Sequence, residues 1–558
     1  MNSMVYALPV VTVWKWDLER LLRRELSHRE VVELLPKLKC EVEEFSGDLI
    51  TYEAPHDRPD LFSAEGLARA LRSLITGEPQ YFNLVDRGLK AFNYGVPLRP
   101  IAAFGVVEDL ELDDEAVSQI MNLQEKLHAT YCRNRAKASI GVYDLDKVTL
   151  PVKYVLADPD STYFTPLGEK RGMSLREIVS ETEKGRVYGH IISSWEKYPL
   201  IIDSSGVILS MPPIINSDET KVTGETKRVL IDSTGVDLKT VLDMVTIMAT
   251  SIAERSISRK IVFVDTYTSN GGAVRAPRAS QGVLSINVED ASSLLGFKVD
   301  SSLAANSLSK MGHRVLSISE SNVVVEVPPH RIDVISWVDL AEDIAMAAGY
   351  AEIGKIAFEL PPAHHPGRVH PLEHLSRRIR HVFIGMGFIE VVNYMMSNPR
   401  AQNEVFGSKE PLVEVLNPKM DKYTCLRRWL TPGLLEVIQV NQERAKEIAI
   451  FEIGDVIVVD SSNEIGARSE RRIGFAISSS EATLTDGLAV LKSLGDTMGW
   501  IVEFKENAIT GFIPERTARV FINGVEAGFI GEIDPRTLVN LGVLKPVVVC
   551  ELCLNKLL

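Results

Sequence analysis

Residues 519–533, RVFINGVEAGFIGEI, decide the fold class of the C-terminal segment of this chain. Apolar runs flank Asn523 and Gly524, and an Asn-Gly pair in this setting is the strongest short-range signal for a β-hairpin. Helical patterns cover 371–388 and follow Thr431 and Pro432, an N-cap and a first-turn proline. Further strand patterns cover 389–396, 413–418, 447–459 and 471–478. The segment is therefore predicted to be α+β, an antiparallel sheet carrying helices.

The whole chain is long enough for several domains. Its 558 residues predict about three to five domains at roughly 150 residues each. The hydrophobic fraction of 45% and the charged fraction of 24% are typical of globular proteins and exclude a disordered, collagenous or coiled-coil chain. We predict a multidomain α+β protein with smaller helical and strand modules. The expected domains are 1–88, 89–268, 280–356 and 362–558.

Charge and cysteine content bear on partners and compartment. Lys and Arg number 61 against 75 Asp and Glu, a net charge of −14, so nucleic-acid binding would need local basic groups or those of a partner. No run of 18 apolar residues occurs, so we expect no membrane span. The five cysteines favour a reducing, cytoplasmic location. Cys550 and Cys553 are expected to lie in a strand rather than at a metal site.

Four carboxylates lie close together in the stretch 328–350, PPHRIDVISWVDLAEDIAMAAGY. Asp339, Glu342 and Asp343 share one face of a predicted helix, and Asp333 precedes it by a few residues. Oxygen ligands of this kind suit a hard cation such as Mg²⁺. The same acids also fit the solvated face of an amphipathic helix, because the apolar residues lie opposite. Spacing alone leaves both interpretations open.

Polar residues gather in three other places. The segment 119–138, QIMNLQEKLHATYCRNRAKA, is predicted to be a helix with a basic end. The loop 211–228, MPPIINSDETKVTGETKR, has side chains that suit either a binding site or a set of turns. Arg58 and Asp60, beside a helix capped by Asp60 or Ser63, either bind a ligand or form a local ion pair.

Together these stretches resemble one family, the beta subunits of phenylalanyl-tRNA synthetases of the shorter archaeal and eukaryotic cytosolic type. The matching stretches keep their order over nearly the whole chain: HDRPDLFSAEGLARAL, QEKLHATYCRNR, PPIINSDETKVT, PPHRIDVISWVDLAEDIAMAAGY, LRRWLTPGLL and FEIGDV. The number and order of these matches make the resemblance far more specific than any single motif.

The resemblance implies a partner and a reaction. The family joins phenylalanine to tRNA(Phe), with ATP as substrate and Mg²⁺ as cofactor, in an α₂β₂ tetramer with an alpha subunit. It implies that 362–558 is a catalytically inactive core similar to class II synthetases, with 371–388 at the subunit interface. The sequence agrees, because Arg427 and Arg428 lack the acid of an F/Y-R-x-E motif and no glycine-rich ATP motif ending in arginine follows. Adenylation is therefore expected on the alpha subunit.

The resemblance also implies site residues. It assigns the carboxylates of Asp333, Asp339, Glu342 and Asp343 to magnesium. It makes 89–268 an editing domain that hydrolyses tyrosyl-tRNA(Phe), which is useful because an apolar pocket rejects an added hydroxyl by only about 10²-fold. The editing candidates are Gln124, His128, Arg133, Asn134, Asn216, Ser217 and Asp218. The alternatives are a structural, tRNA-binding subunit without editing and, less favoured by the acidic charge, a free-standing deacylase or nucleic-acid-binding protein.

Overall fold

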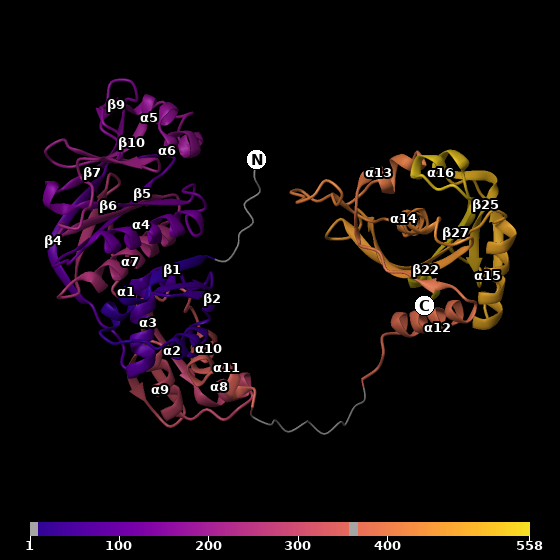
Figure 1. Ribbon diagram of the computed structural model, residues 1–558, viewed down its shortest axis with the longest axis horizontal. Coiled ribbons are helices and arrows are strands. Elements are labelled where there is room, and N and C mark those ends of the chain that lie inside the picture. Colours follow the sequence, from indigo (N-terminus) through magenta and orange to yellow (C-terminus); the bar gives the residue numbers. More distant parts are fainter. Residues whose placement is uncertain (1–8, 356–366) are drawn as a thin grey trace. The chain divides into compact units, whose positions relative to one another are not determined.

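The computed structural model describes residues 9–355 and 367–558 (Figure 1). They fall into two compact units, which comprise residues 9–355 and 367–558 of the described chain. Each unit has its own sheets and helices, which confirms the multidomain α+β prediction. The predicted boundary between 356 and 362 lies outside the described residues. No helix of the described ranges combines the length and the apolar character that crossing a membrane requires.

The N-terminal module of the first unit is a three-stranded sheet, ordered β1-β3-β2, with helices packed beside it. Ser63 caps α3 as predicted, since its hydroxyl accepts the Gly66 N–H at 3.3 Å. Arg58 and Asp60 form a buried ion pair with two N–O distances of 2.9 Å, so the local-pair interpretation is confirmed. The elements are β1 Val10–Trp14, α1 Lys15–Leu22, α2 His28–Leu34, η1 Leu35–Leu38, β2 Glu41–Ser46, β3 Leu49–Glu53, η2 Pro59–Leu61 and α3 Ala64–Thr76.

The central domain of the first unit is built on a ten-stranded mixed sheet. The strand order is β12-β11-β10-β7-β4-β14-β5-β13-β6, with β15 on β14, and helices α4 and α7 pack against β5, β6 and β13. The elements are β4 Asn83–Asn93, β5 Ile101–Val107, α4 Asp114–Ala129, β6 Ala138–Asp144, η3 Leu145–Lys147, β7 Val152–Ala157, β8 Tyr163–Phe164, β9 Met173–Ser174, α5 Leu175–Glu181, α6 Glu183–Tyr188, η4 Gly189–Ile191, β10 Tyr198–Ile202, β11 Ile208–Met211, β12 Ile215–Asn216, β13 Val229–Gly235, α7 Leu238–Ile252, η5 Ala253–Arg255, β14 Lys260–Thr268 and β15 Ala273–Ala276. The sheet thus extends beyond the predicted domain limits of 89 and 268 at both ends.

A buried arginine joins the N-terminal module to the central domain. The Arg255 guanidinium donates to both carboxylate oxygens of Asp17 at 2.7 Å and, through Nε, to Glu65 at 2.7 Å. None of the three side chains is more than 2% exposed. Because a buried charge without its partner costs several kcal/mol, this contact fixes helices α1 and α3 against the end of α7.

The third module of the first unit is a three-stranded sheet, ordered β16-β18-β17, covered by helices. Gly296 ends α8 in the left-handed conformation, at φ +74°, which glycine adopts readily at a helix C-terminus. The elements are β16 Gly282–Asn287, α8 Val288–Leu295, α9 Ser301–Lys310, β17 Arg314–Ile318, β18 Asn322–Val327, α10 Trp337–Ala348 and α11 Tyr350–Ile353.

The second unit contains a seven-stranded sheet, ordered β19-β22-β23-β27-β26-β25-β24. All its pairs are antiparallel except β19 with β22. Asn523 and Gly524 have φ values of +52° and +83°, so the predicted hairpin turn is confirmed. The elements are α12 Pro371–Gly385, β19 Ile389–Glu390, β20 Met396–Ser397, α13 Pro399–Gln402, η6 Glu404–Phe406, β21 Cys425–Leu426, α14 Thr431–Asn441, β22 Ile448–Val459, β23 Ala467–Ser478, α15 Leu484–Met498, β24 Val502–Glu506, β25 Phe512–Ile522, β26 Val525–Ile533, α16 Pro535–Leu541, β27 Val547–Cys553 and η7 Leu554–Leu557.

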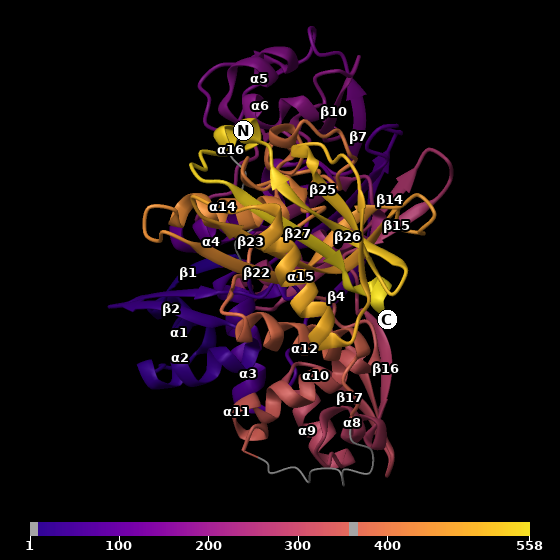
Figure 2. The ribbon, with the colours of Figure 1, turned by 90° about the vertical axis from the view of Figure 1, so that its right-hand side faces the viewer.

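Both faces of this sheet are covered by helices. Strand β27 alternates between two cores: Val548, Cys550 and Leu552 pack with α12 and α15, whereas Val547 and Val549 pack with α14. Figure 2 shows α15 lying across strands β26 and β27. Buried on both sides, the strand carries apolar residues at nearly every position, as double burial requires.

Two strand predictions in this unit are wrong. Within 389–396 only Ile389–Glu390 and part of β20 are strand, and 413–418 contains a single bridge, from Glu414 to Cys425. Val392 and Leu416 face outward instead of the core, at 88% and 93% exposed, whereas Val391 still packs against it. Thr431, predicted as the residue before the helix, is instead the first residue of α14, so the helix begins one residue earlier than expected. The Thr431 N–H and hydroxyl both donate to buried Glu551 and are satisfied there.

Replacing Glu551 by alanine is expected to destabilise the second unit by about 3 kcal/mol. The change removes a partner of Arg472 at 2.8 Å and the acceptor of the Leu430 and Thr431 N–H groups. Urea unfolding of the full chain, followed by circular dichroism, measures the shift. Glu526→Ala is the control, because Glu526 is 47% exposed and its pair with Arg519 contributes at most about 1 kcal/mol. Equal midpoints for the two variants would contradict the prediction.

Candidate functional site

A cavity of about 110 Å³ lies in the central domain between helix α4, the loop after β11 and the inner face of the sheet. Its walls are largely apolar. Three polar side chains, Tyr143, Ser210 and Asp232, meet at one place in its lining, each from a different strand. A cavity of this kind, with apolar walls and a few convergent polar groups, is typical of small-ligand sites. The apolar side chains of its lining are Met121, Ile140, Leu167, Pro212, Pro213, Ile214 and Ile215.

The polar group is tightly connected. The Tyr143 hydroxyl lies 2.7 Å from Ser210 Oγ and 2.5 Å from Asp232 Oδ1. Asp232 stands opposite Gly141 in the β6–β13 pair. A Cβ at Gly141 would lie 2.1 Å from Asp232 Oδ1 and from the Tyr143 hydroxyl. Only glycine leaves the space that this hydrogen-bonded group occupies.

Burial changes the proton affinity of Asp232. It raises the pKa of the carboxyl to about 7, although the Tyr143 hydroxyl and the Arg99 charge act in the opposite direction. Near neutral pH the Asp232 carboxyl is therefore present in both protonation states. It can accept a hydrogen bond from a ligand hydroxyl or donate one to it. A perturbed pKa in a cavity is the mark of a candidate functional group.

Charged side chains line another part of the cavity. Arg135 donates to the carbonyl oxygens of Pro213 and Ile214 at 3.1 and 2.8 Å and to Glu125 at 2.7 Å. Lys184 lies 3.3 Å from the other oxygen of Glu125. Burial raises the pKa of Glu125, but His128, whose Nδ1 lies 3.6 Å away, and the Arg135 charge outweigh it and bring the pKa to about 2. Glu125 is thus ionised at neutral pH.

Two of the seven editing candidates line this cavity, Gln124 and Asn216. Gln124 donates to the Ile140 carbonyl at 2.9 Å, and its own carbonyl oxygen has no partner. His128 does not line the cavity: its Nε2 accepts the Ile140 N–H at 2.9 Å. Burial lowers the pKa of His128 to about 4, so the ring is neutral at pH 7 and holds α4 against β6.

The predicted helix over 119–138 is wrong at its C-terminal end, because α4 stops at Ala129. Arg133, Asn134 and Arg135 follow with φ values of +50°, +50° and +66°. This left-handed turn carries Arg135 into the cavity lining and leaves Arg133 and Asn134 exposed. The chain reverses here to enter β6, which a continued helix would prevent.

The loop candidates Ser217 and Asp218 also lie off the cavity. The Ser217 hydroxyl donates to the Thr165 carbonyl at 3.4 Å. Asp218 pairs with Lys221 at 3.2 Å and donates its backbone N–H to the same Thr165 carbonyl at 2.9 Å. These two residues therefore build the turn that holds Asn216 in place.

Sequence reasoning missed Arg135, Tyr143, Ser210 and Asp232. One signal was available for Asp232. It interrupts VLIDSTG, the strand Val229–Gly235, whose residues are all buried. A carboxylate in such a run needs either a paired charge or a function.

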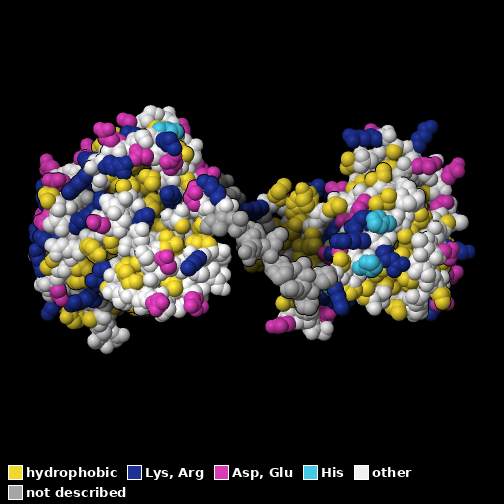
Figure 3. All heavy atoms as spheres, turned by 90° about the horizontal axis from the view of Figure 1, so that it is seen from below, with side chains coloured by type: hydrophobic (Ala, Val, Ile, Leu, Met, Phe, Trp, Pro, Cys, Tyr) yellow, Lys and Arg dark blue, Asp and Glu magenta, His cyan; other side chains and the backbone are white. Residues whose placement is uncertain are grey.

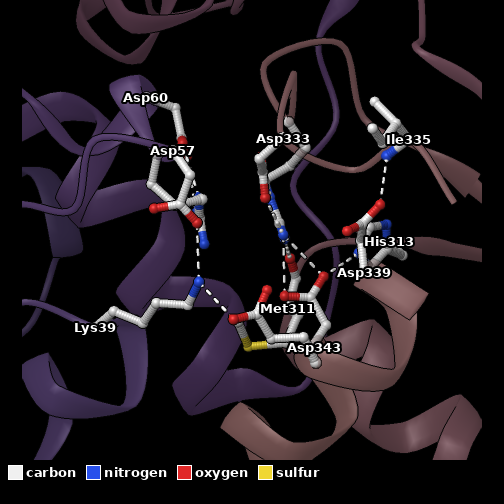
Figure 4. Close-up of polar contacts among 12 residues, drawn as sticks. Lys39, Asp57, Asp60, Met311, His313, Asp333, Ile335, Asp339 and Asp343 are labelled. Carbon is white, nitrogen blue, oxygen red and sulfur yellow. Dashed lines mark hydrogen bonds and ion pairs between the residues drawn. The ribbon is translucent and has the colours of Figure 1, made fainter. Parts of the chain in front are cut away.

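The four acidic residues of the third module each contact a protein partner (Figure 4). Asp333 and Asp343 flank Arg331, with shortest N–O distances of 2.7 and 2.8 Å. Asp343 also lies 2.6 Å from His313 Nε2. Burial raises the pKa of Asp343, but Arg331 and His313 outweigh it and keep that pKa far below its ordinary value.

The other two acids point elsewhere. Asp339 accepts the N–H groups of Ile335 and Ser336 at 2.9 and 2.7 Å, and Glu342 pairs with Lys39 at 2.6 Å. Within residues 9–355 and 367–558, no group of three or more His, Cys, Asp or Glu side chains is arranged to hold a metal ion. As arranged here, the four carboxylates do not fit a shared Mg²⁺, whose binding stays an untested prediction.

Comparisons with known proteins agree over the whole chain. Family models match at 113–262 (B3/4 domain), 284–350 (tRNA synthetase B5 domain) and 356–554 (phenylalanyl-tRNA synthetase beta chain CLM domain). The phenylalanine–tRNA ligase beta subunit of Thermofilum pendens is 39% identical over 98% of this chain and 97% of that protein. This chain belongs to the phenylalanine–tRNA ligase beta subunit family. The family expected from the sequence motifs is thus confirmed.

Further relatives of the beta subunit family support the assignment. The beta subunit from Pyrococcus furiosus is 35% identical over 99% of this chain and 100% of that protein. A crystal structure of an N-terminal fragment of the phenylalanyl-tRNA synthetase beta subunit from Pyrococcus horikoshii matches with a TM-score of 0.57 at 35% identity. The match covers 61% of this chain and 100% of that fragment.

Asp232→Asn is expected to change how stability depends on pH. The folded pKa of about 7 exceeds the unfolded value of about 3.9, so between these values the folded state holds more protons. Asp232 therefore stabilises the fold at low pH, and this stability is lost as pH rises to about 7. In the wild type the free energy of unfolding should fall by about 4 kcal/mol at most over this range, whereas in Asp232→Asn this fall should be absent. Urea unfolding of both proteins across this pH range measures it, and parallel pH profiles would refute the assignment.

Proposed function

We propose that this chain works with an alpha subunit, in an α₂β₂ tetramer, to form phenylalanyl-tRNA(Phe) from phenylalanine, ATP and tRNA(Phe). Adenylation takes place on the alpha subunit. The second unit supports this division of labour, because its arginines near the expected phosphate motif are engaged internally. Arg427 pairs with buried Glu452 at 2.5 Å and donates to the Asp455 carbonyl at 2.9 Å. Arg428 donates to Asn403 at 2.9 Å. The Arg427 guanidinium is therefore not free to hold a phosphate, and Arg428 is held in place by neutral groups.

We further propose that the cavity of the central domain hydrolyses tyrosyl-tRNA(Phe). The observation that carries this proposal is the Tyr143–Ser210–Asp232 group in the lining of an apolar cavity. Tyrosine differs from phenylalanine by one hydroxyl, and a site that hydrogen-bonds a hydroxyl discriminates by about 10⁴–10⁵-fold. A dry cavity of about 150 Å³ admits a benzene ring, so the cavity of about 110 Å³, which is open on one side, has the right scale for a phenol.

The chemistry is attack of water on the aminoacyl ester, with the proton passing to the departing ribose oxygen. The cavity lining, which lies wholly within the described residues, contains no His or Cys. We therefore assign the role of nucleophile to a positioned water and not to the serine or cysteine of a Ser-His or Cys-His pair. Gln124, with its unpaired carbonyl oxygen, and Asn216 are the neutral groups available to orient it. Lys184, 40% exposed, is placed to meet the phosphates of the tRNA end.

The runner-up function is a structural and tRNA-binding subunit without editing. The lining of the cavity would then serve packing alone. The two functions differ in one measurement, the release of tyrosine from Tyr-tRNA(Phe) by the assembled enzyme.

Asp232→Asn is expected to slow tyrosine release by about 10- to 100-fold, since a lost buried hydrogen bond costs about 1.4–3 kcal/mol. Aminoacylation with phenylalanine should be unchanged. The assay uses the chain co-expressed with its alpha subunit and radiolabelled Tyr-tRNA(Phe). Asp218→Asn is the matched control, because Asp218 lies off the cavity and pairs with Lys221. No hydrolysis by the wild type would leave the structural subunit as the better proposal.

The alpha subunit needs an apolar surface to dock on, and the second unit exposes one. The expected interface helix α12 buries Leu375, Ile379 and Phe383 in its own unit. On α12 itself Ile384 is 52% exposed, and more strongly exposed apolar side chains occur around Tyr394 and Leu416, at 78% and 93%. Backbone hydrogen bonds join 395–397 to 424–427, and a cavity of about 660 Å³ lies beside them. Figure 3 shows hydrophobic side chains gathered at one end of this unit.

Val392→Asp is expected to abolish co-purification of the alpha subunit, because a charge buried in an apolar interface lacks a partner. Val392 is 88% exposed, so the fold of the isolated chain should not change. Pull-down with a tagged alpha subunit measures the effect. Ile465→Asp, at an 82% exposed position on the β22–β23 turn, is the control. Retention of the alpha subunit by Val392→Asp would move the interface elsewhere.

A further inference from the structure

We propose that the acidic cluster of the third module is held by cations of this chain, Arg331 and Lys39, and not by a magnesium ion. The cluster is then a joint between the N-terminal module and the third module. The proposal does not depend on the editing function, since it concerns a different part of the first unit.

Arg331 occupies the position between the buried acid Asp343 and the partly buried acid Asp333. Its Nε and Nη2 donate to Asp333 at 3.0 and 2.7 Å. Its Nη2 also lies 2.9 and 2.8 Å from the two oxygens of Asp343, and Nη1 donates to the Met311 carbonyl at 3.0 Å. The guanidinium is only 2% exposed. All three nitrogens of the planar fork are engaged, which is the geometry that suits arginine to a pair of carboxylates.

A magnesium ion would need the same oxygens. Mg²⁺ requires close oxygen ligands, at about 2.0–2.1 Å, in nearly ideal octahedral geometry. Both oxygens of Asp343 face Arg331, and Oδ2 also faces His313 Nε2 at 2.6 Å. An ion at these oxygens would lie against a guanidinium. Two like charges about 4 Å apart near a protein surface repel by several kcal/mol, and a divalent ion doubles that repulsion.

The two remaining acids have separate tasks. Asp339 accepts the N–H groups of Ile335 and Ser336, so it satisfies donors at the start of α10 (Figure 4). Glu342 pairs with Lys39 of the N-terminal module at 2.6 Å. The four acids lie between residues 333 and 343, with Asp333 ahead of α10, but they have different partners: Arg331 and His313, backbone N–H groups, and Lys39.

Lys39 makes the cluster a joint between modules. Its ammonium group bridges Asp57 at 2.8 Å and Glu342 at 2.6 Å. These two acids are 46% and 43% exposed, so water screens the negative charge that Arg331 and Lys39 do not match. The joint is thus complete without a divalent ion, and chelation should leave it intact.

The test measures binding and stability on the full chain with the metal alone. Electron paramagnetic resonance of Mn²⁺ as the magnesium probe should give the same occupancy for wild type, Asp333→Asn and the exposed control Glu320→Gln. The melting temperature of wild type should be the same in EDTA and in millimolar Mg²⁺. Mn²⁺ binding that is lost only in Asp333→Asn, or a saturable rise in melting temperature that Asp333→Asn abolishes, would overturn the proposal.

Arg331→Met gives the second arm. Removing the guanidinium leaves buried Asp343 without its cation and next to the partly buried Asp333, so the melting temperature should fall by about 10 °C. Mg²⁺, which has no effect on wild type, should restore part of the loss. Where this variant does not fold, Lys39→Met, at a partly exposed position, tests the joint, and its melting temperature should fall in EDTA and Mg²⁺ alike. An unchanged melting temperature of Lys39→Met would contradict the proposed joint.

Discussion

Buried arginines that pair with acids determine the geometry of the first unit. Arg255 ties Asp17 and Glu65 to the end of α7, and Arg331 ties two acids of the third module together. Each guanidinium is only 2% exposed, so losing a partner would leave a charge in a medium that cannot solvate it. A misplaced helix would carry this penalty, and the Arg255 contact therefore specifies how helices α1 and α3 of the N-terminal module meet the end of α7.

The same rule explains why Asp232 stands out. Other buried acids, such as Asp60 and Asp343, have a guanidinium beside them, and their pKa values are lowered. Asp232 is held by the Tyr143 hydroxyl, and its pKa is raised to about 7. Asp60 and Asp343 are engaged by arginine, whereas Asp232 forms no ion pair with an arginine of the described residues and lies in the lining of a cavity, where it can bind a ligand hydroxyl. The hydroxyl-recognising site follows from that contrast more than from any motif.

Much of the fold could be predicted from the sequence, because local rules govern it. The hairpin at Asn523, the cap at Ser63 and the end of α8 at Gly296 each depend on a few neighbouring residues. The candidate site could not be predicted as well, because it depends on which strands lie side by side. Tyr143, Ser210 and Asp232 are far apart in sequence and meet through sheet order alone. The seven editing candidates lie in two polar stretches. Of these candidates, only Gln124 and Asn216 line the cavity.

The spacing of the acids along α10 does not predict their partners, for a related reason. The positions i, i+3 and i+4 place three carboxylates on one face, but each side chain then turns toward the nearest donor. For Asp339 the donors are the backbone N–H groups of Ile335 and Ser336 at the start of the helix. For Glu342 the donor is Lys39, and for Asp343 it is Arg331. Arg331 lies two residues before Asp333 in the same motif, so the sequence contained the competing cation all along. A cluster of acids predicts a cation; whether that cation is an ion or a side chain is decided by which one the fold brings within 3 Å of the oxygens.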